Sequence, residues 1–307
     1  MLSRTAGNLY WLGRYVERAD ATSRLLGMGA RMTLVPGASS RDDWQSVLDA
    51  AGVQRPETSV SGRPEALQAL LLNPDSGSSI HSCMQLARFN GRAERTALTS
   101  AMWDALNDNW RRFDGMDYRA ASRALPDHID FAQRWAGAFR GAMDTTMLRN
   151  DRYGFIRLGS HVERAAMTLR LLEVKYLVLL PERDVIGGGR DLYQWTSLLL
   201  ASSGLRAYHH LYKGDFAPWN IADLLALNRT FPRSVAFCLH EVNTTLAGLA
   251  EAYGQSHPCH EMSAALDTKL STATMNDIFA DGLFEWVSET LHDVLSLSNL
   301  IRDAYGF

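Results

Sequence analysis

One helix-length pattern occurs twice in this chain, and it constrains the fold more than any other feature. Residues 12–26 read LGRYVERADATSRLL and residues 158–172 read LGSHVERAAMTLRLL, at a constant separation of 146 residues. Ten of the fifteen positions are identical without a gap. Such a match predicts an internal duplication with pseudo-twofold symmetry, in which the halves cover approximately residues 1–150 and 151–307.

The repeated segment has the periodicity of an amphipathic helix. Leu12, Val16, Ala19, Ser23 and Leu26 are separated by three or four residues, which places them on one helix face. No alternating strand pattern is found. The sequence therefore predicts an all-α protein with a single helical bundle. Beyond the repeat and a short helix at 44–51, helices are expected over 83–113, 119–149, 190–213, 232–253 and 277–304.

Composition excludes several classes of protein. Of the 307 residues, 46% are hydrophobic and 21% are charged, which is typical of a chain with a sizeable core and not of a disordered one. The formal charge of −3 argues against nucleic acid and anionic membrane surfaces as partners. Three widely spaced cysteines predict no disulfide framework, and no apolar signal segment opens the chain. A cytoplasmic protein is expected, with a polar, mobile insert at residues 35–63.

The repeated helix also carries charges in a regular row. Gly13, Glu17 and Arg24 share one face, and the second copy repeats this row as Gly159, Glu163 and Arg170. A glycine inside a helix costs roughly 1 kcal/mol relative to alanine, so close approach of a neighbouring helix is its natural explanation. We expect the two helices to cross at these glycines, with Glu17 reaching Arg170 and Glu163 reaching Arg24.

These charges have two interpretations. Buried Glu–Arg pairs commonly fix the register of packed helices. Alternatively, Glu17 and Glu163 form a paired-carboxylate centre for acid–base catalysis. A second row places three arginines on one helix face, suited to phosphate or carboxylate groups, unless they pair with acidic residues or face water. The candidate ligand-binding residues are therefore Arg18, Arg24, Arg88, Arg92, Arg95, Arg164 and Arg170.

Metal and cofactor signals are weak. A di-metal bundle needs two Glu-x-x-His motifs, and one is present, at Glu289 and His292. The cluster His257-Pro258-Cys259-His260-Glu261 is short and has no matching ligand pair elsewhere, which favours a solvated loop. A glycine-rich stretch at 187–190 lacks the remainder of a phosphate-binding loop. No metal and no cofactor are expected.

Four segments in order resemble the bacterial alpha-E domain family, which carries a repeated Glu-Arg motif. They are SRTAGNLYWLGRYVERADATSRLL (3–26), ARFNGRAERTALTSAMWDALN (87–107), FIRLGSHVERAAMTLRLLEVKY (155–176) and FPRSVAFCL (231–239). The chain departs from the family at Gly7 and Phe89, where glutamate is usual, and at Ser160, where arginine is common. These departures imply a reduced or altered site if those positions contribute to one in relatives.

The resemblance implies a cellular context more than a chemistry. Family members are similar to proteins encoded beside ATP-grasp ligases and transglutaminase-like proteins, which implies a shared system that makes or trims amide bonds. The first hypothesis is an accessory helical protein that binds such a ligase, its anionic or peptide ligand, or both. The alternative is an enzyme that uses Glu17 and Glu163 as acid and base on an amide or peptide-like substrate. A carboxylate-bridged metal protein is the third reading.

Overall fold

The computed structural model describes residues 1–33, 40–53, 62–177, 189–213 and 216–307, and they form an all-α protein. No strand occurs within these ranges. The elements of the first half are α1 (Ser3–Met32), α2 (Ser40–Ala50), α3 (Arg63–Leu67), the π-helical turn η1 (Gln68–Leu72), α4 (Ile80–Ala93), α5 (Ser100–Asn107), α6 (Tyr118–Arg123) and α7 (Leu125–Thr146).

The second half presents a matching succession. Its elements are α8 (Asp151–Leu177), α9 (Gly189–Ala201), α10 (Leu205–Tyr212), α11 (Pro218–Ala226), α12 (Val235–Tyr253), α13 (Pro258–Thr272), α14 (Met275–Asp281) and α15 (Leu283–Tyr305). Each half opens with its longest helix, which then contacts the fifth and eighth elements of the same half. The order of contacts is therefore the same in the two halves.

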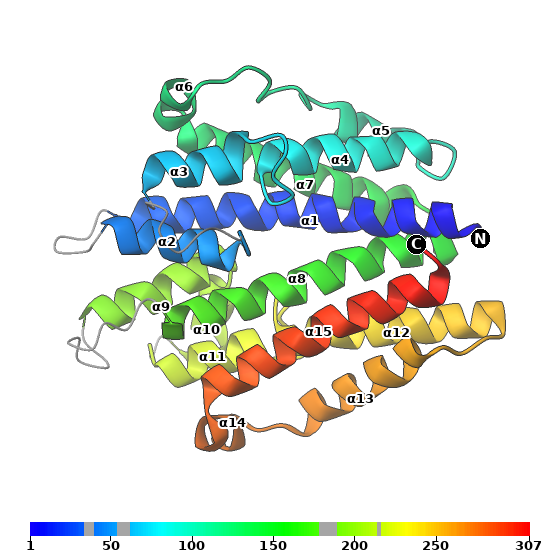
Figure 1. Cartoon of the computed structure of the whole chain (residues 1–307). Coiled ribbons are helices and arrows are strands. Elements are labelled where there is room, and N and C mark those ends of the chain that lie inside the picture. The colour runs from blue at the N-terminus through cyan, green and yellow to red at the C-terminus, as the bar shows by residue number, and fades with distance from the viewer. Residues whose placement is uncertain (34–39, 54–61, 178–188, 214–215) are drawn as a thin grey trace.

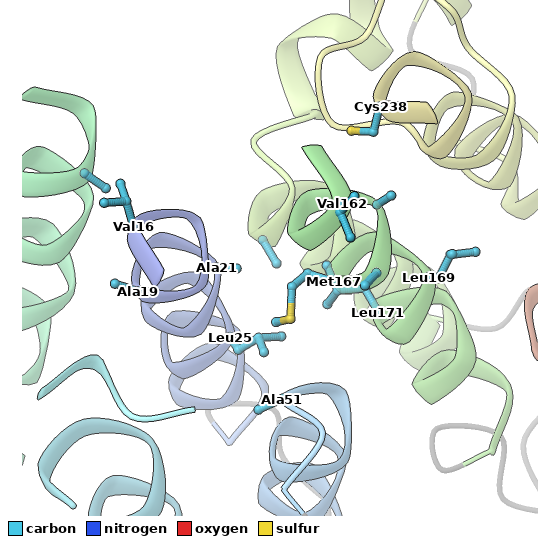
Figure 2. Packing of buried hydrophobic residues seen from close by; sticks show 14 of the residues in the cluster. Val16, Ala19, Ala21, Leu25, Ala51, Val162, Met167, Leu169, Leu171 and Cys238 are labelled. Carbon is cyan, nitrogen blue, oxygen red and sulfur yellow. The ribbon is translucent and has the colours of Figure 1, made fainter. Parts of the chain in front are cut away.

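The two long helices α1 and α8 lie side by side at the centre and run in the same direction (Figure 1). Helices α4 and α7 cover α1 on one side, and α12 and α15 cover α8 on the other. The apolar stripe of the repeat is buried as the periodicity predicts, including Leu12, Val16 and Leu26. Met167 of α8 extends toward Leu25 of α1 (Figure 2).

Several helices expected to be continuous are broken by identifiable residues. The segment 83–113 divides where α4 ends at Ala93, and 119–149 divides between α6 and α7. Residues 190–213 divide near Ser203, whose φ is +57°, and 277–304 divides at Gly282, whose φ is +105°. A residue with positive φ interrupts an α-helix, so the breaks at Ser203 and Gly282 are local backbone events that hydrophobic periodicity does not register.

The short helix expected near residue 44 is present as α2. The remainder of the predicted insert at 35–63 falls largely on residues 34–39 and 54–61, outside the described residues, as do residues 187 and 188 of the glycine-rich stretch. Within the described ranges, no helix has both the length and the apolar character needed to cross a bilayer.

Candidate functional site: a buried arginine–carboxylate cluster

The two repeated helices meet at their glycines. A Cβ atom added to Gly13 would lie 2.1 Å from the carbonyl oxygen of Ile156, and one added to Gly159 would lie 1.9 Å from that of Tyr10. These are backbone atoms, which cannot move aside as a flexible side chain can. The crossing predicted from the repeat is confirmed, and only glycine permits it.

Beyond this crossing, the Glu-Arg dipeptides pair reciprocally. Arg164 donates from Nε and Nη2 to the two carboxylate oxygens of Glu17, at 2.9 and 2.8 Å. Arg18 donates from the same two atoms to the carboxylate of Glu163, at 2.6 and 2.9 Å. Each arginine therefore binds the glutamate of the opposite helix through two parallel hydrogen bonds, which is the strongest arrangement for this pair.

The prediction that Glu17 reaches Arg170 and Glu163 reaches Arg24 is wrong. Because α1 and α8 run in the same direction, the residue level with Glu17 is Arg164, not Arg170. A helix rises about 1.5 Å per residue, so Arg170 lies roughly 9 Å further along. Arg24 instead donates to Asp20 at 3.0 Å and bonds Ser203, and the guanidinium of Arg170 lies against Gly52.

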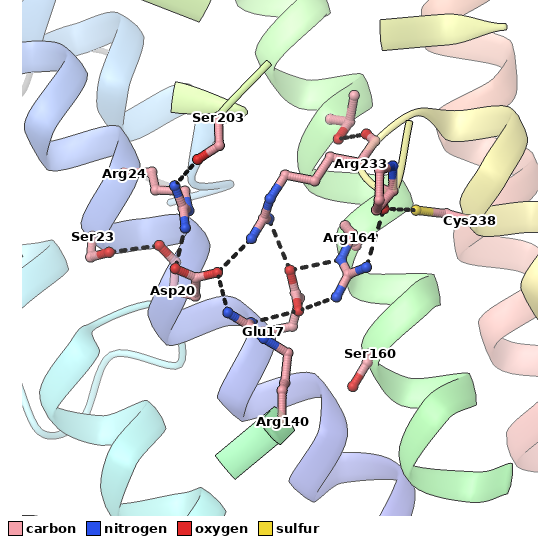
Figure 3. Close-up of polar contacts among 12 residues, drawn as sticks. Glu17, Asp20, Ser23, Arg24, Arg140, Ser160, Arg164, Ser203, Arg233 and Cys238 are labelled. Atoms are coloured by element: carbon pink, nitrogen blue, oxygen red, sulfur yellow. Dashed lines mark hydrogen bonds and ion pairs between the residues drawn. The ribbon is translucent and has the colours of Figure 1, made fainter. Parts of the chain in front are cut away.

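A second carboxylate extends the cluster on the α1 side. Asp20 is completely buried and accepts hydrogen bonds from Arg140 of α7 at 3.0 Å and from Arg233, which lies just before α12, at 2.6 Å. The same two arginines also donate to Glu17, at 3.1 and 3.0 Å. Figure 3 shows Arg140 and Arg233 approaching the two carboxylates from different elements. They therefore tie the outer helices to α1.

The α8 side is simpler. Glu163 accepts a further hydrogen bond from Arg14 at 2.7 Å, and Arg14 also donates to Ser298 of α15 at 2.8 Å. Ala166 stands 146 residues after Asp20, so this side has no second carboxylate from the repeat. In total, six arginines form ion pairs with three buried carboxylates within the described residues.

The arginines keep these carboxylates ionised. Burial alone would raise the pKa of Glu163, but Arg18 and Arg14 lower it to about 2. Burial likewise opposes ionisation of Glu17, and Arg164, Arg233 and Arg140 hold its pKa well below the usual range. Both glutamates are therefore charged acceptors with every oxygen hydrogen-bonded, which leaves neither with a proton to give.

The cavity beside Glu17 is small. A cavity of about 20 Å³ is bordered by Glu17, Arg24, Arg164 and Arg233. That volume is about enough for one water molecule. The space at this point of the cluster suits a single bound water and not an amide substrate.

The surroundings of the two bidentate pairs match as well. Arg18 donates its remaining Nη1 to the carbonyl oxygen of Gly77 at 2.9 Å, and Arg164 donates its own to that of Pro232 at 3.1 Å. Gly77 and Pro232 each lie two residues before a serine that caps a helix, Ser79 for α4 and Ser234 for α12. The separation of these positions is 155 residues, so the matched contacts extend the internal similarity well beyond the repeated helix.

The second predicted row does not join this cluster. Arg92 and Arg95 are exposed, and Arg88 is half-buried against α5, where it donates to Asn107 at 2.8 Å. Within the described residues, none of the three forms an ion pair. Of the interpretations of this row, ion pairing with acidic residues is therefore not found in that part of the chain, and the exposed Arg92 and Arg95 face water.

No group of three or more metal-ligating side chains is found within the described part of the chain. His257 and His260 face each other at the start of α13, where the loop prediction for 257–261 is wrong, since α13 begins at Pro258. Glu289 pairs with Lys269 at 2.8 Å, so the single Glu-x-x-His motif contributes its carboxylate to an exposed ion pair.

Four residues of the cluster were not predicted from the sequence to be site residues. They are Arg14, Asp20, Arg140 and Arg233. Asp20 and Arg14 interrupt the repeat, where the second copy has Ala166 and Ser160, so the search for identical positions passed over them. Arg233 lay within a family-like segment that had no assigned role, and Arg140 carries no signal in its own helix.

Fold and cluster together define a class: an all-α domain whose halves are joined by a repeated Glu-Arg motif. A family model described as a predicted alpha-helical domain with a conserved ER motif, named Alpha-E, matches residues 1–305. The chain belongs to this Alpha-E family.

Curated relatives include an uncharacterised protein of Mycobacterium bovis and uncharacterised proteins of two Mycobacterium tuberculosis strains. Each is 21% identical in an alignment of 316 positions that covers 94% of this chain and 35% of the relative. The chain thus spans about a third of the length of these relatives. No solved structure matches it.

Proposed function

We propose that this protein is a non-catalytic helical partner of an ATP-grasp-type ligase in peptide or amide-bond metabolism. The observation that carries the proposal is the closure of the Glu-Arg cluster. Glu17 and Glu163, the residues best placed by sequence to act as acid and base, are each held by arginines on both oxygens. A cluster of this kind stabilises a fold and fixes its register.

Acid–base chemistry requires a group whose pKa lies near the working pH. Glu163 has a pKa of about 2, and that of Glu17 is also strongly lowered. In a carboxyl group that serves as a catalytic acid, burial without a compensating cation raises the pKa. Here the arginines lower the pKa of both glutamates, which is the reverse arrangement. The enzyme alternative based on these two residues therefore has no supporting geometry.

Two further considerations support a protein partner. The mycobacterial relatives are about three times as long as the region they share with this chain, so their similar region is one part of a larger protein. The resemblance to proteins encoded beside ATP-grasp ligases and transglutaminase-like proteins supports an ATP-grasp ligase as the class of partner.

The test is co-purification followed by a ligation assay. The full chain and an ATP-grasp protein encoded beside it are expressed together, and one carries an affinity tag. We expect a stable complex and a rate of ATP-dependent amide formation that rises when this chain is added. Absence of both the complex and the rate change would contradict the proposal.

A matched control separates a structural role of the cluster from a catalytic one. The Glu163→Gln variant is assayed at a temperature where circular dichroism shows it folded. The proposal predicts that the ligation rate is then unchanged within about twofold. A loss of activity greater than about a hundredfold in the folded variant would instead assign Glu163 a catalytic role.

A further inference from the structure

Arginine and tryptophan side chains alternate along the outer surface of α4, α5 and the turn that follows α5. The guanidinium of Arg88 lies 5.5 Å from the ring centre of Trp103 and 4.3 Å from that of Trp110. Arg95 lies 5.3 Å from Trp103, and Arg111 lies 4.6 Å from Trp110. We call these five side chains the Arg–Trp ladder, and α4 and α5 lie at the edge of the bundle (Figure 1).

The ladder holds positive charge with little neutralisation. Arg88 and Arg95 have no carboxylate within ion-pair distance in the described part of the chain, and Arg111 has Asp114 at 4.0 Å. Partial burial, together with repulsion from Arg92 and Arg111, lowers the pKa of Arg88. Stacking on indole rings restrains the arginines. Arg88 uses its Nε on Asn107 and Arg95 uses one Nη on the carbonyl oxygen of Leu98, which leaves their other N–H groups to bind an anion.

An exposed apolar group accompanies this charge. Phe89, which follows Arg88 on α4, is 68% exposed. An exposed aromatic residue beside restrained arginines is the composition typical of protein interfaces. A partner that suits this surface carries carboxylates and at least one apolar side chain.

The other half shows that the fold does not require the ladder. The positions 155 residues after Arg88, Arg92 and Arg95 are Asn243, Ala247 and Ala250 of α12. Helix α13, which packs on α12 as α5 packs on α4, contains neither tryptophan nor arginine. The ladder is therefore a property of one half, in contrast to the shared Glu-Arg pairs.

The geometry favours an acidic polypeptide over a single-stranded nucleic acid. Bases bind such surfaces by stacking on open aromatic faces. Here Arg88 and Arg95 lie over Trp103, and Arg88 and Arg111 lie over Trp110, so a base that stacks on either ring has to compete with an arginine already there. The N–H groups that these arginines do not use within the protein can donate to a carboxylate of a partner.

We propose that the Arg–Trp ladder, with Phe89, docks an extended acidic segment of a partner protein that alternates carboxylates with apolar side chains. That this partner is the ligase rests on the proposed function; the docking of an acidic segment does not. The proposal therefore adds a location and a chemistry to an association that the cluster itself does not specify.

The test uses the full chain and a fluorescein-labelled peptide of alternating Glu and Leu residues, measured by fluorescence anisotropy. We expect binding that weakens as salt is added, because the contacts are between exposed charges. Arg88→Gln removes the arginine shared by both rings and should weaken binding about tenfold or more. Arg134→Gln is the matched control, since Arg134 is an exposed arginine paired with Asp130 at 3.2 Å, and it should change the affinity less than twofold.

Three results would overturn the proposal. They are no binding of the Glu-Leu peptide to the unmodified chain, equal effects of Arg88→Gln and Arg134→Gln, and tighter binding of an oligothymidylate than of the peptide. Circular dichroism melting of each variant confirms that it is folded. The peptide assay is independent of the ligation assay, so peptide binding without any ligase association would overturn the proposed function alone.

Discussion

The two halves of the molecule share one set of contacts and differ in what surrounds it. Arg18 and Arg164 bind the opposite glutamate through the same atoms, and both reach a backbone carbonyl beside a helix start. Around Glu17 lies a second carboxylate, Asp20, whereas Glu163 has none within the described residues. The reciprocal pairs hold the halves together, and the positions around them are free to differ.

This difference predicts unequal costs when each glutamate is neutralised. Glu163→Gln leaves Arg14 and Arg18 without their carboxylate, and we expect it to lower the free energy of unfolding by about 3–5 kcal/mol. Glu17→Gln should cost less, because Asp20 still neutralises Arg140 and Arg233. Urea unfolding measures both. A larger loss for Glu17→Gln would show that the second carboxylate provides no such reserve.

Substitution at the glycine contact between α1 and α8 should give the next largest change in the free energy of unfolding. Gly159→Ala would place a Cβ 1.9 Å from the carbonyl oxygen of Tyr10, and overpacking of this kind costs about 1–3 kcal/mol. Gly137 of α7 is the matched control, because nothing lies within 4 Å of its added Cβ. Gly137→Ala should stabilise the protein by about 0.5–1 kcal/mol. Equal effects of the two variants in thermal melting would contradict the close crossing.

Acid should remove the stabilisation that the ionised Glu163 side chain gives to the folded protein. The pKa of Glu163 is about 2 in the folded protein against an ordinary value of 4.5, so the folded state binds its proton less readily than the unfolded state. Its stabilisation is therefore complete above about pH 4.5 and is lost as the pH falls toward 2. By pH 3 the loss from this group is on the order of 2 kcal/mol.

The difference in free energy of unfolding between the unmodified protein and Glu163→Gln should narrow over the same pH range, since the variant lacks the titrating group. Urea unfolding at pH 7, 5 and 3 provides the comparison. A gap that stays constant from pH 7 to pH 3 would show that Glu163 does not stabilise the fold as an ion.

The last prediction concerns the reactivity of two cysteines at matching positions in the two halves. Burial raises the pKa of the Cys83 and Cys238 thiols to about 12, so almost no thiolate exists near neutral pH. We expect neither to react with iodoacetamide in the folded protein and both to react in urea, as followed by mass spectrometry. Rapid labelling of one but not the other in the folded state would show that the two halves differ at these positions too.

The sequence was informative where identical residues recur and uninformative where contacts depend on helix direction. The repeat predicted the all-α fold, the buried face of α1 and the glycine crossing. It did not predict that Glu17 pairs with Arg164, because that choice depends on α1 and α8 running in the same direction. Arg140 joins the cluster from another helix, and no spacing along the chain could reveal it.

The sequence pattern also failed to predict where some helices end. The hydrophobic pattern of 277–304 continues across Gly282, yet its φ of +105° divides the segment into α14 and α15. By contrast, the match between Asn73–Cys83 and Asn228–Cys238 was present in the sequence as three identities, Asn, Ser and Cys, at a separation of 155. It escaped notice because its separation differs from the 146 of the repeated helix.

The central claim is that each carboxylate of the repeat is held by the arginine of the opposite helix. A double-mutant cycle on Glu17 and Arg164, with Glu17 and Arg170 as the comparison, tests it most directly. We expect a coupling energy of about 1.5 kcal/mol or more for Glu17–Arg164 and one within about 0.5 kcal/mol of zero for Glu17–Arg170. A larger coupling of Glu17 to Arg170 than to Arg164 would contradict the account.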